Sequence, residues 1–272
     1  MTVVTTQPDI PPRVEVPPVQ PHVARVALIG NPNSGKTSLF NQLTGLNQKV
    51  GNFPGVTVDK KTGYSQLTPK LKAQIIDLPG TYSLYPKSLD ERIIIDLLYD
   101  PQSAHYPDLV VVTADASNLK RNLLLFTQLA DLQIPAVLAL NMVDVAEQEG
   151  VKINIPVLHK ELGVPVIPMN ARKGKGVAAL KILMTQQPEP TKVNFYEVPA
   201  ELQPLLQNIK ARFGLHNDYL ALQYAHHYKG LKFLKVEDTL CVSIWSRRLL
   251  NFSSFPVFST RTTSSSISLM RV

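Results

Sequence analysis

The sequence lacks several features that would place it in other protein classes. It has one cysteine, Cys241, so an intramolecular disulfide is excluded and a reducing compartment is favoured. No run of about 18 apolar residues occurs, so the residues given contain no expected membrane-spanning helix. Residues 1–6 lack the basic region and apolar core of a secretory signal. The six histidines show no metal-ligand spacing with cysteine or carboxylates, which argues against a zinc-type site.

The charge balance is basic, but the basic residues are not concentrated. Lysine and arginine total 28 against 21 acidic residues, a formal net charge of +7. Because no block of five like charges occurs, scattered solvated lysines explain the excess better than a nucleic-acid or anionic-membrane surface. The chain has 272 residues, 44% of them apolar, which is enough for one large domain and a small appendage.

Four regions follow one another along the chain. Residues 1–24 are rich in proline and are predicted to form a disordered tail. Residues 25–187 alternate short β-branched runs with longer amphipathic stretches, which predicts an α/β fold with a six-stranded, mainly parallel sheet. Residues 188–236 have helical signals without strand signals and predict a small helical appended domain. Residues 237–272 end in a Ser/Thr-rich stretch and are predicted to be an atypical, disordered tail.

The expected elements place every motif at one edge of the sheet. The expected strands cover residues 25–29, 60–67, 71–76, 109–114, 136–140 and 164–168. The expected helices cover residues 35–44, 89–99, 119–132, 155–162, 177–187, 200–213 and 219–228. Ligands of doubly wound sheets bind at the carboxyl ends of the strands, where the motifs below lie.

The most informative motif is a phosphate-binding loop between the first strand and the first helix. It fits the pattern G-x-x-x-x-G-K-[ST]. Exposed backbone N–H groups and the helix N-terminus favour an anion. Lys36 can supply a charge to the β- and γ-phosphates, and the Thr37 hydroxyl can reach Mg²⁺. The predicted phosphate-binding residues are Gly30, Asn31, Pro32, Asn33, Ser34, Gly35, Lys36, Thr37 and Ser38.

Two further segments are predicted to contact the phosphates. Asp77 ends a strand and could hold Mg²⁺ through water, and the N–H of Gly80 could meet the γ-phosphate. Alone, this Pro-Gly segment could equally well be an ordinary turn. Thr57, in a loop rich in glycine, could close over Mg²⁺ when the γ-phosphate is present. The residues predicted to bind in these segments are Gly55, Val56, Thr57, Asp77, Leu78, Pro79 and Gly80.

Two motifs farther along indicate that the base is guanine. Asp144 can accept hydrogen bonds from N1–H and the 2-amino group of guanine, a pair of donors that adenine does not present. As an isolated motif, Asn-x-x-Asp after a strand would be a helix cap. A backbone N–H after the last strand, that of Ala171, could meet the guanine carbonyl. The residues predicted to read the base are Asn141, Met142, Val143, Asp144, Asn170, Ala171 and Arg172.

Together these motifs resemble the cytosolic G domain of the ferrous iron transport protein B family. The resemblance covers about residues 25–235, and its discriminating parts are Val-Gly-Asn-Phe-Pro-Gly-Val-Thr-Val (50–58) and Asp-Leu-Pro-Gly-Thr-Tyr-Ser-Leu (77–84). It implies a Ras-like P-loop GTPase followed by a small helical, dissociation-inhibitor-like domain. In that family an Fe²⁺ membrane domain follows, and the G domain lies on the cytoplasmic face of the inner membrane.

The resemblance also implies roles for individual residues. Lys36 would bind phosphate, Thr37 and Thr57 would hold Mg²⁺ with Asp77 behind a water, and Asn141 with Asp144 would read guanine. Asn33 matches an asparagine that coordinates K⁺ in potassium-stimulated GTPases. The alternative for this residue is that it only shapes the turn. The four residues assigned to catalysis are Lys36, Asn33, Thr57 and Gly80.

One difference from Ras-like enzymes and two departures from the family pattern qualify these expectations. Thr81 occupies the position of the water-positioning glutamine of Ras-like enzymes, so hydrolysis is expected to be slow without K⁺ or a partner. Asn170 stands where the family usually has serine, so the base contacts there are expected to differ from the family pattern. From about Cys241 the sequence does not continue into membrane helices, which suggests a frame change or a truncation. We expect this chain alone to be soluble and cytoplasmic.

Two other functions fit part of the sequence. A GTPase of ribosome or RNA maturation shares the phosphate loop, but no KH-type Gly-x-x-Gly loop or aromatic-basic stripe follows residue 188. A nucleotide-bound switch with negligible hydrolysis would carry the same motifs. We expect GTP and GDP as ligands, Mg²⁺ and K⁺ as cofactors, and no nucleic acid; the oligomeric state is left open.

Overall fold

The computed structural model describes residues 24–46, 48–52, 59–86 and 88–250. Its centre is a seven-stranded sheet in the order β2-β3-β4-β1-β5-β6-β7. The pairs β4-β1, β1-β5, β5-β6 and β6-β7 are parallel, whereas β2-β3 and β3-β4 are antiparallel. The strands are β1 (Ala24–Gly30), β2 (Gln48–Asn52), β3 (Asp59–Thr68), β4 (Leu71–Asp77), β5 (Leu109–Asp115), β6 (Ala136–Asn141) and β7 (Val166–Pro168).

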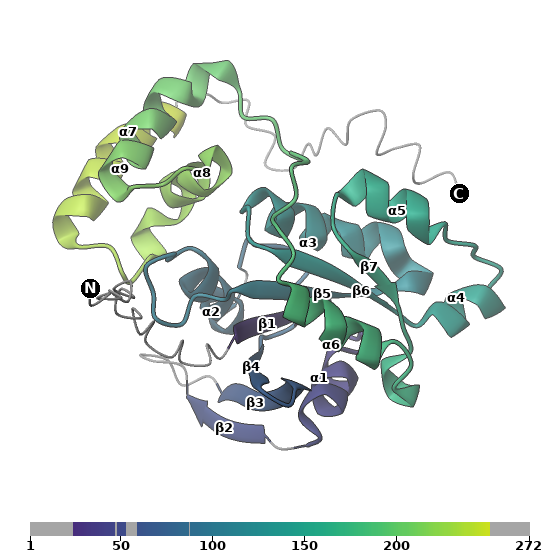
Figure 1. Cartoon of the computed structure of the whole chain (residues 1–272). Helices are drawn as coiled ribbons and strands as arrows, with labels where there is room; N and C mark the ends of the chain where they lie inside the picture. Colours follow the sequence, from purple (N-terminus) through teal and green to yellow (C-terminus); the bar gives the residue numbers. More distant parts are fainter. Residues whose placement is uncertain (1–23, 47, 53–58, 87, 251–272) are drawn as a thin grey trace, which may run out of the picture.

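Helices cover both faces of the sheet, which confirms the predicted Ras-like, mainly parallel α/β fold (Figure 1). All six expected strands are present, and β2 is an additional strand at the edge. The helices are α1 (Lys36–Thr44), α2 (Leu89–Leu98), α3 (Leu119–Asp131), α4 (Val143–Gln148), α5 (Ile155–Leu162), α6 (Val177–Gln186), α7 (Gln203–Phe213), α8 (Asp218–His227) and α9 (Val236–Leu250).

The alternation of side chains along the buried strands divides the core into two parts. On one face Val26 and Leu28 of β1 pack with Phe40 of α1 and Leu180 of α6. On the other face the core includes Ile29 of β1 and residues of α2, α3 and α5. The central strands are buried on both faces, which explains why they read as continuous apolar runs.

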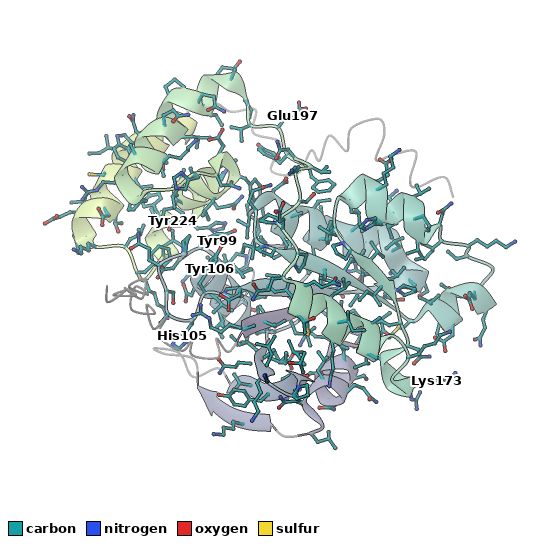
Figure 2. The ribbon with its side chains drawn as sticks, viewed as in Figure 1. Tyr99, His105, Tyr106, Lys173, Glu197 and Tyr224 are labelled. Atoms are coloured by element: carbon teal, nitrogen blue, oxygen red, sulfur yellow. The ribbon has the colours of Figure 1, made fainter. Side chains whose placement is uncertain are left out.

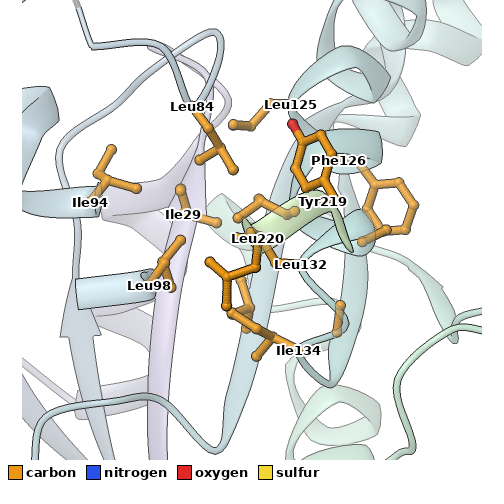
Figure 3. Close-up of a cluster of buried hydrophobic side chains, with 14 of the residues drawn as sticks. Ile29, Leu84, Ile94, Leu98, Leu125, Phe126, Leu132, Ile134, Tyr219 and Leu220 are labelled. Atoms are coloured by element: carbon orange, nitrogen blue, oxygen red, sulfur yellow. The ribbon is translucent and has the colours of Figure 1, made fainter. Parts of the chain in front are cut away.

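The helical segment shares this second core. Figure 3 shows Tyr219 and Leu220 of α8 among Ile29, Leu98 and Leu132 of the α/β domain. A contact of this kind removes apolar surface of both parts from water, which stabilises the fold by roughly 25 cal/mol per Å² buried. The appended helices therefore form part of one hydrophobic core with the α2–α3 face of the sheet.

One boundary differs from expectation. Residues from 237 onward were expected to be a tail, whereas α9 runs from Val236 to Leu250 and contacts α7 and α8. Val242 is fully buried, and the Ser246 hydroxyl donates a hydrogen bond to the carbonyl of Ala225 at 3.0 Å. These tertiary contacts stabilise a helix whose own apolar pattern is weak. The remainder of the expected tail, and the N-terminal tail through residue 23, lie outside the described residues.

Asp131, at the end of α3, ties the helical segment to the α/β domain. Its buried carboxylate accepts a hydrogen bond from the N–H of Phe195 at 2.7 Å. Its carbonyl accepts one from the side chain of Asn217, which also caps α8 through the N–H of Leu220. Burial raises the pKa of Asp131 to about 7, although the backbone N–H groups of Phe195 and Tyr196 oppose the shift.

Asp131→Asn is expected to flatten part of the pH dependence of stability. A folded-state pKa above the unfolded value means that the folded protein holds more protons between pH 3.8 and about 7. The contribution of Asp131 therefore falls as the pH rises through this window, by at most about 1.4 kcal/mol per pH unit. The measurement is the free energy of unfolding of the variant minus that of the wild type, in denaturant, at about pH 5 and about pH 8. The difference should shift in favour of the variant at the higher pH.

The control for this experiment is Asp218→Asn. Lys210 holds the pKa of Asp218 below its usual value, so Asp218 is ionised above about pH 5 in the folded and in the unfolded protein. The free energy of unfolding of this variant minus that of the wild type should therefore be the same at both pH values. The wild-type subtraction removes other titrations, such as that of His227, whose pKa burial lowers to about 4. A flat difference for Asp131→Asn would show that the buried carboxylate is not protonated near neutrality.

Candidate nucleotide site

The loop between β1 and α1 has the backbone that a phosphate cradle needs. Asn33 and Gly35 both have positive φ, at 65° and 83°. A Cβ on Gly35 would lie 2.1 Å from Nδ2 of Asn141, so only glycine fits there. α1 then begins at Lys36, which leaves its first N–H groups at the mouth of the loop.

Lys36 and Asp77 form an ion pair at the base of this loop. Their side chains are only 11% and 7% exposed. The pair forms because β4 lies beside β1, with Asp77 in register with Leu28. The two residues predicted to bind phosphate and to hold Mg²⁺ through water therefore lie together, at the carboxyl end of the sheet.

The segment after β4 lies directly against the phosphate loop. The Thr81 N–H donates to the carbonyl of Gly30 at 3.2 Å. A Cβ on Gly80 would lie 3.2 Å from Cα of Pro32, so a larger residue would press on the loop. This contact places the Gly80 backbone beside the phosphate loop, as the prediction requires.

Thr81 itself is turned away from the loop. It is 1% exposed, and its hydroxyl lies 2.8 Å from the Ser83 carbonyl and 3.0 Å from a carboxylate oxygen of Glu91. The Thr81 hydroxyl is thus occupied by contacts within its own segment and with α2.

Asn141 joins the phosphate loop to the loop after β7. Its Nδ2 donates to the carbonyl of Ser34 at 2.9 Å, and its Oδ1 accepts from the N–H of Ala171 at 2.8 Å. The side chain is buried. Two loops more than a hundred residues apart in sequence are thus fixed at one edge of the sheet.

Asp144 follows one turn later, in the first turn of α4. Its side chain is 38% exposed, and its Oδ2 accepts a hydrogen bond from Nδ2 of Asn170 at 2.6 Å. The ammonium of Lys173 lies 3.5 Å from the same oxygen. Lys173 lies at the α4–α6 side of the molecule, far from the helical segment (Figure 2). A carboxylate is therefore presented at the same edge of the sheet as the phosphate loop.

Comparison with known proteins identifies the family to which this arrangement belongs. The family model described as ferrous iron transport protein B matches residues 24–184. The chain belongs to the ferrous iron transport protein B family. The Fe(2+) transporters FeoB of Shigella flexneri and of Escherichia coli strain K12 are each 45% identical over 185 residues. Those alignments cover 66% of this chain and 23% of each relative, so the chain spans about a quarter of the relatives' length.

Solved structures of this family extend the match beyond the G domain. The G domain of T. maritima FeoB covers 61% of this chain with a TM-score of 0.56 and 40% identity, and 99% of that structure is covered. The cytosolic domain of L. pneumophila FeoB covers 83% with a TM-score of 0.66 and 35% identity, and 93% of that structure is covered. The similarity therefore continues past the G domain into the helical segment.

Several residues expected to bind have other roles in this G domain. Leu78 is buried in the core, and its N–H donates to the carbonyl of Leu28 at 3.0 Å. Val143 packs against the apolar core. The N–H of Ala171, expected at the guanine carbonyl, is donated to Asn141. Arg172 is exposed, and Gly55, Val56 and Thr57 lie outside the described residues.

The structure also adds residues that the sequence analysis of this family member did not assign to the site. The carbonyl of Arg121 accepts a hydrogen bond from the Asn31 side chain at 3.4 Å. The Arg121 guanidinium lies 4.0 Å from the ring centroid of Tyr82, a cation–π contact. Arg121 thus links the phosphate loop to the segment after Asp77. No local motif marks it, because the contact depends on how α3 packs.

Polar atoms beneath the phosphate loop are buried without protein partners. Within the residues that the structure describes, the side-chain oxygens of Asn31, Ser34 and Thr113 are buried and make no hydrogen bond. Buried polar groups of this kind are normally satisfied by water or a bound group. The same part of the chain contains no cluster of three or more His, Cys, Asp or Glu side chains that could hold a metal, and no helix long and apolar enough to cross a membrane.

Proposed function

We propose that this chain binds GTP and GDP and hydrolyses GTP as the regulatory G domain of a ferrous iron transport protein. The observation that carries the proposal is the bridge made by Asn141 between the Ser34 carbonyl and the Ala171 N–H. It fixes the phosphate loop and the base loop relative to each other, with Asp144 one turn away. A nucleotide laid across this edge would have its phosphates at Lys36 and its base at Asp144.

The reaction proposed is attack of water on the γ-phosphorus of GTP. A bond forms between the water oxygen and phosphorus, the bond to the β–γ bridging oxygen breaks, and GDP leaves with that oxygen. Lys36 would neutralise charge on the β- and γ-phosphates, and the backbone N–H groups of the loop and of Gly80 would donate to phosphate oxygens. Phosphoryl transfer needs little more from protein than this positioning and charge stabilisation.

Mg²⁺ fits the oxygen groups of the site. When bound, it would neutralise negative charge on the phosphates. Thr37 would hold it through an exposed hydroxyl together with Thr57, and Asp77 through a water, because hard cations prefer oxygen ligands. The Asp77 carboxylate pairs with Lys36, so binding of phosphate and Mg²⁺ would require both side chains to exchange partners.

Slow hydrolysis and stimulation by K⁺ form the finer part of the proposal. Thr81 is buried and engaged with Ser83 and Glu91, so the side chain at the position of the water-positioning glutamine is not available to orient water. Asn33 is exposed and holds a positive φ at the loop's outer turn, where its amide oxygen can face a cation beside the phosphates. We therefore expect K⁺ to supply charge that other GTPases receive from an arginine finger.

Phosphate release tests this finer part. We expect GTP hydrolysis by the wild type to be faster in K⁺ than in Na⁺ buffer, by about tenfold if the ion stabilises the transition state by about 1.4 kcal/mol. Asn33→Ala should bring both rates to the Na⁺ level while leaving GDP affinity near that of the wild type. Equal rates in all four conditions would contradict a K⁺ site at Asn33.

The proposed partner of this domain is an Fe²⁺ membrane permease. The relatives are Fe(2+) transporters, of which the chain matches 23%. Because α8 shares one apolar core with α2 and α3, a movement of the segment after Asp77 could be passed on to the helical segment. Tyr85, in that segment, packs its ring against that of His227 with centroids 5.4 Å apart. A change in order with nucleotide state would therefore reach α8 directly.

A further inference from the structure

The carboxylate proposed to read guanine needs something to hold its direction. Asp144 lies on a helix of six residues that begins after Met142, a residue in the left-handed conformation. Its side chain is 38% exposed, so burial alone does not fix its rotamer. The two donors of guanine, N1–H and the 2-amino group, are recognised only if both carboxylate oxygens lie near the plane of the base. A neighbouring group must therefore orient Asp144.

We infer that Asn170 is the positioning residue that orients Asp144 for guanine recognition, an inference that rests on the proposed function. The Asn170 Nδ2 donates to Oδ2 of Asp144 at 2.6 Å. Within the part of the chain that the structure describes, the other oxygen, Oδ1, receives no hydrogen bond from protein. Oδ2 is thus held by Asn170 and still has a lone pair that can accept a second hydrogen bond, and Oδ1 is free to accept one from a base.

Asn170 is itself held in place from several directions. Its Oδ1 accepts from the N–H of Lys173 at 3.0 Å, which caps the short turn Ala171–Lys173. Its own N–H and carbonyl pair with the carbonyl and N–H of Lys175 at 3.0 and 3.1 Å. With the oxygen committed to the cap, the amide N–H₂ can only point toward Asp144. The donor is therefore preorganised.

Lys173 is less suited to this role. Its side chain is 74% exposed, and its ammonium lies 3.5 Å from the carboxylate oxygen. A flexible exposed ammonium attracts a carboxylate without fixing its plane, and such surface pairs contribute little. The side-chain amide of Asn170 is directional and half-buried, so it sets the angle of the carboxylate.

The same residue connects the base site to the phosphate site. Asn170 is followed by Ala171, whose N–H donates to Asn141, and Asn141 donates to the carbonyl of Ser34. A continuous set of hydrogen bonds thus runs from the phosphate loop to Asp144. A serine at this position would have one hydroxyl, on a shorter side chain, for both contacts. Asparagine uses two atoms: Oδ1 caps the turn and Nδ2 orients the Asp144 carboxylate.

The test compares GDP with IDP, which lacks only the 2-amino group. Affinities are measured by equilibrium binding with Mg²⁺ for the wild type, Asn170→Ala, Asn170→Ser and Asn170→Asp. The wild type should prefer GDP, and Asn170→Ala should reduce that preference by about three- to tenfold, the effect of one charge-assisted hydrogen bond. Asn170→Asp should reduce it further because it sets a second carboxylate beside Asp144, and Asn170→Ser, which keeps one donor of shorter reach, should lie between the wild type and Asn170→Ala.

The matched control is Asn217→Ala. Asn217 caps α8 through the N–H of Leu220 at 2.8 Å, so this variant removes the same kind of cap in the helical segment and should leave the GDP-to-IDP ratio unchanged. If Asn170→Ala weakens both ligands by one factor, Asn170 is only a cap and the inference fails. Should the alanine variant not fold, the ratio of GDP to IDP affinity of the serine and aspartate variants tests the inference in the same way. A wild-type protein that does not prefer GDP to ADP would instead overturn the proposed function.

Discussion

Asp144→Asn is expected to lower the affinity for GDP by about a hundredfold or more and to make XDP the better ligand. The carboxylate accepts from both N1–H and the 2-amino group of guanine. An amide at the same place offers one acceptor and one donor, which suits the N1–H and 2-oxo groups of xanthine. Removing a partner from a polar site costs most, because the donor left behind is desolvated and unpaired.

The structure makes this a clean substitution. Asn170 donates to Oδ2 of Asp144, and an asparagine oxygen can accept that same bond. The fold should therefore be retained, and thermal unfolding of the variant provides the check. Equilibrium binding of GDP and XDP gives the result. A variant that still prefers GDP would show that Asp144 does not read the base.

Lys36→Ala is expected to abolish measurable nucleotide affinity at micromolar protein, a loss of about a thousandfold. Two effects combine. The phosphates lose their point charge, which lowers the affinity. Asp77 is left as a nearly buried carboxylate without its partner, since the pair is only 11% and 7% exposed, which lowers the free energy of unfolding. Breaking a buried pair by removing one member costs about 3–5 kcal/mol.

Two further variants separate these effects. Lys36→Met combined with Asp77→Asn removes both charges, so it should recover stability without recovering binding. Lys210→Ala removes a Lys–Asp pair of 2.7 Å in the helical segment and should leave GDP affinity unchanged. Measurable GDP binding by the double variant at wild-type strength would mean that Lys36 acts only through Asp77.

The fold was predictable where the apolar pattern is strong. β5 and β6 are buried on both faces and were expected within a residue of their ends. The edge strand β2 was missed because Gln48–Asn52 has no alternation of apolar and polar residues. It belongs to the sheet through its pairing with β3. The short helix α4 was also missed, because its six residues are too few to show a helical repeat of apolar residues. α9 exposes Leu240 and Ile244 and depends on packing against α7 and α8.

The site was predictable at the level of motifs but not of contacts. Sequence placed Lys36, Asp77, Asn141 and Asp144 at strand ends, and the topology of the sheet brings them to one edge. It could not show that Thr81 faces Glu91, or that the Ala171 N–H is taken by Asn141, because these depend on side-chain direction across elements. The position of Asn170 looked like a departure from the family pattern, whereas the geometry gives it a specific partner.

The most direct test of the account is phosphate release from GTP and from ATP by the purified protein, with Mg²⁺ in K⁺ buffer. A guanine-specific hydrolase should release phosphate from GTP above the rate without protein and leave ATP at that background rate. Equal release from both nucleotides, or background release from GTP, would contradict it.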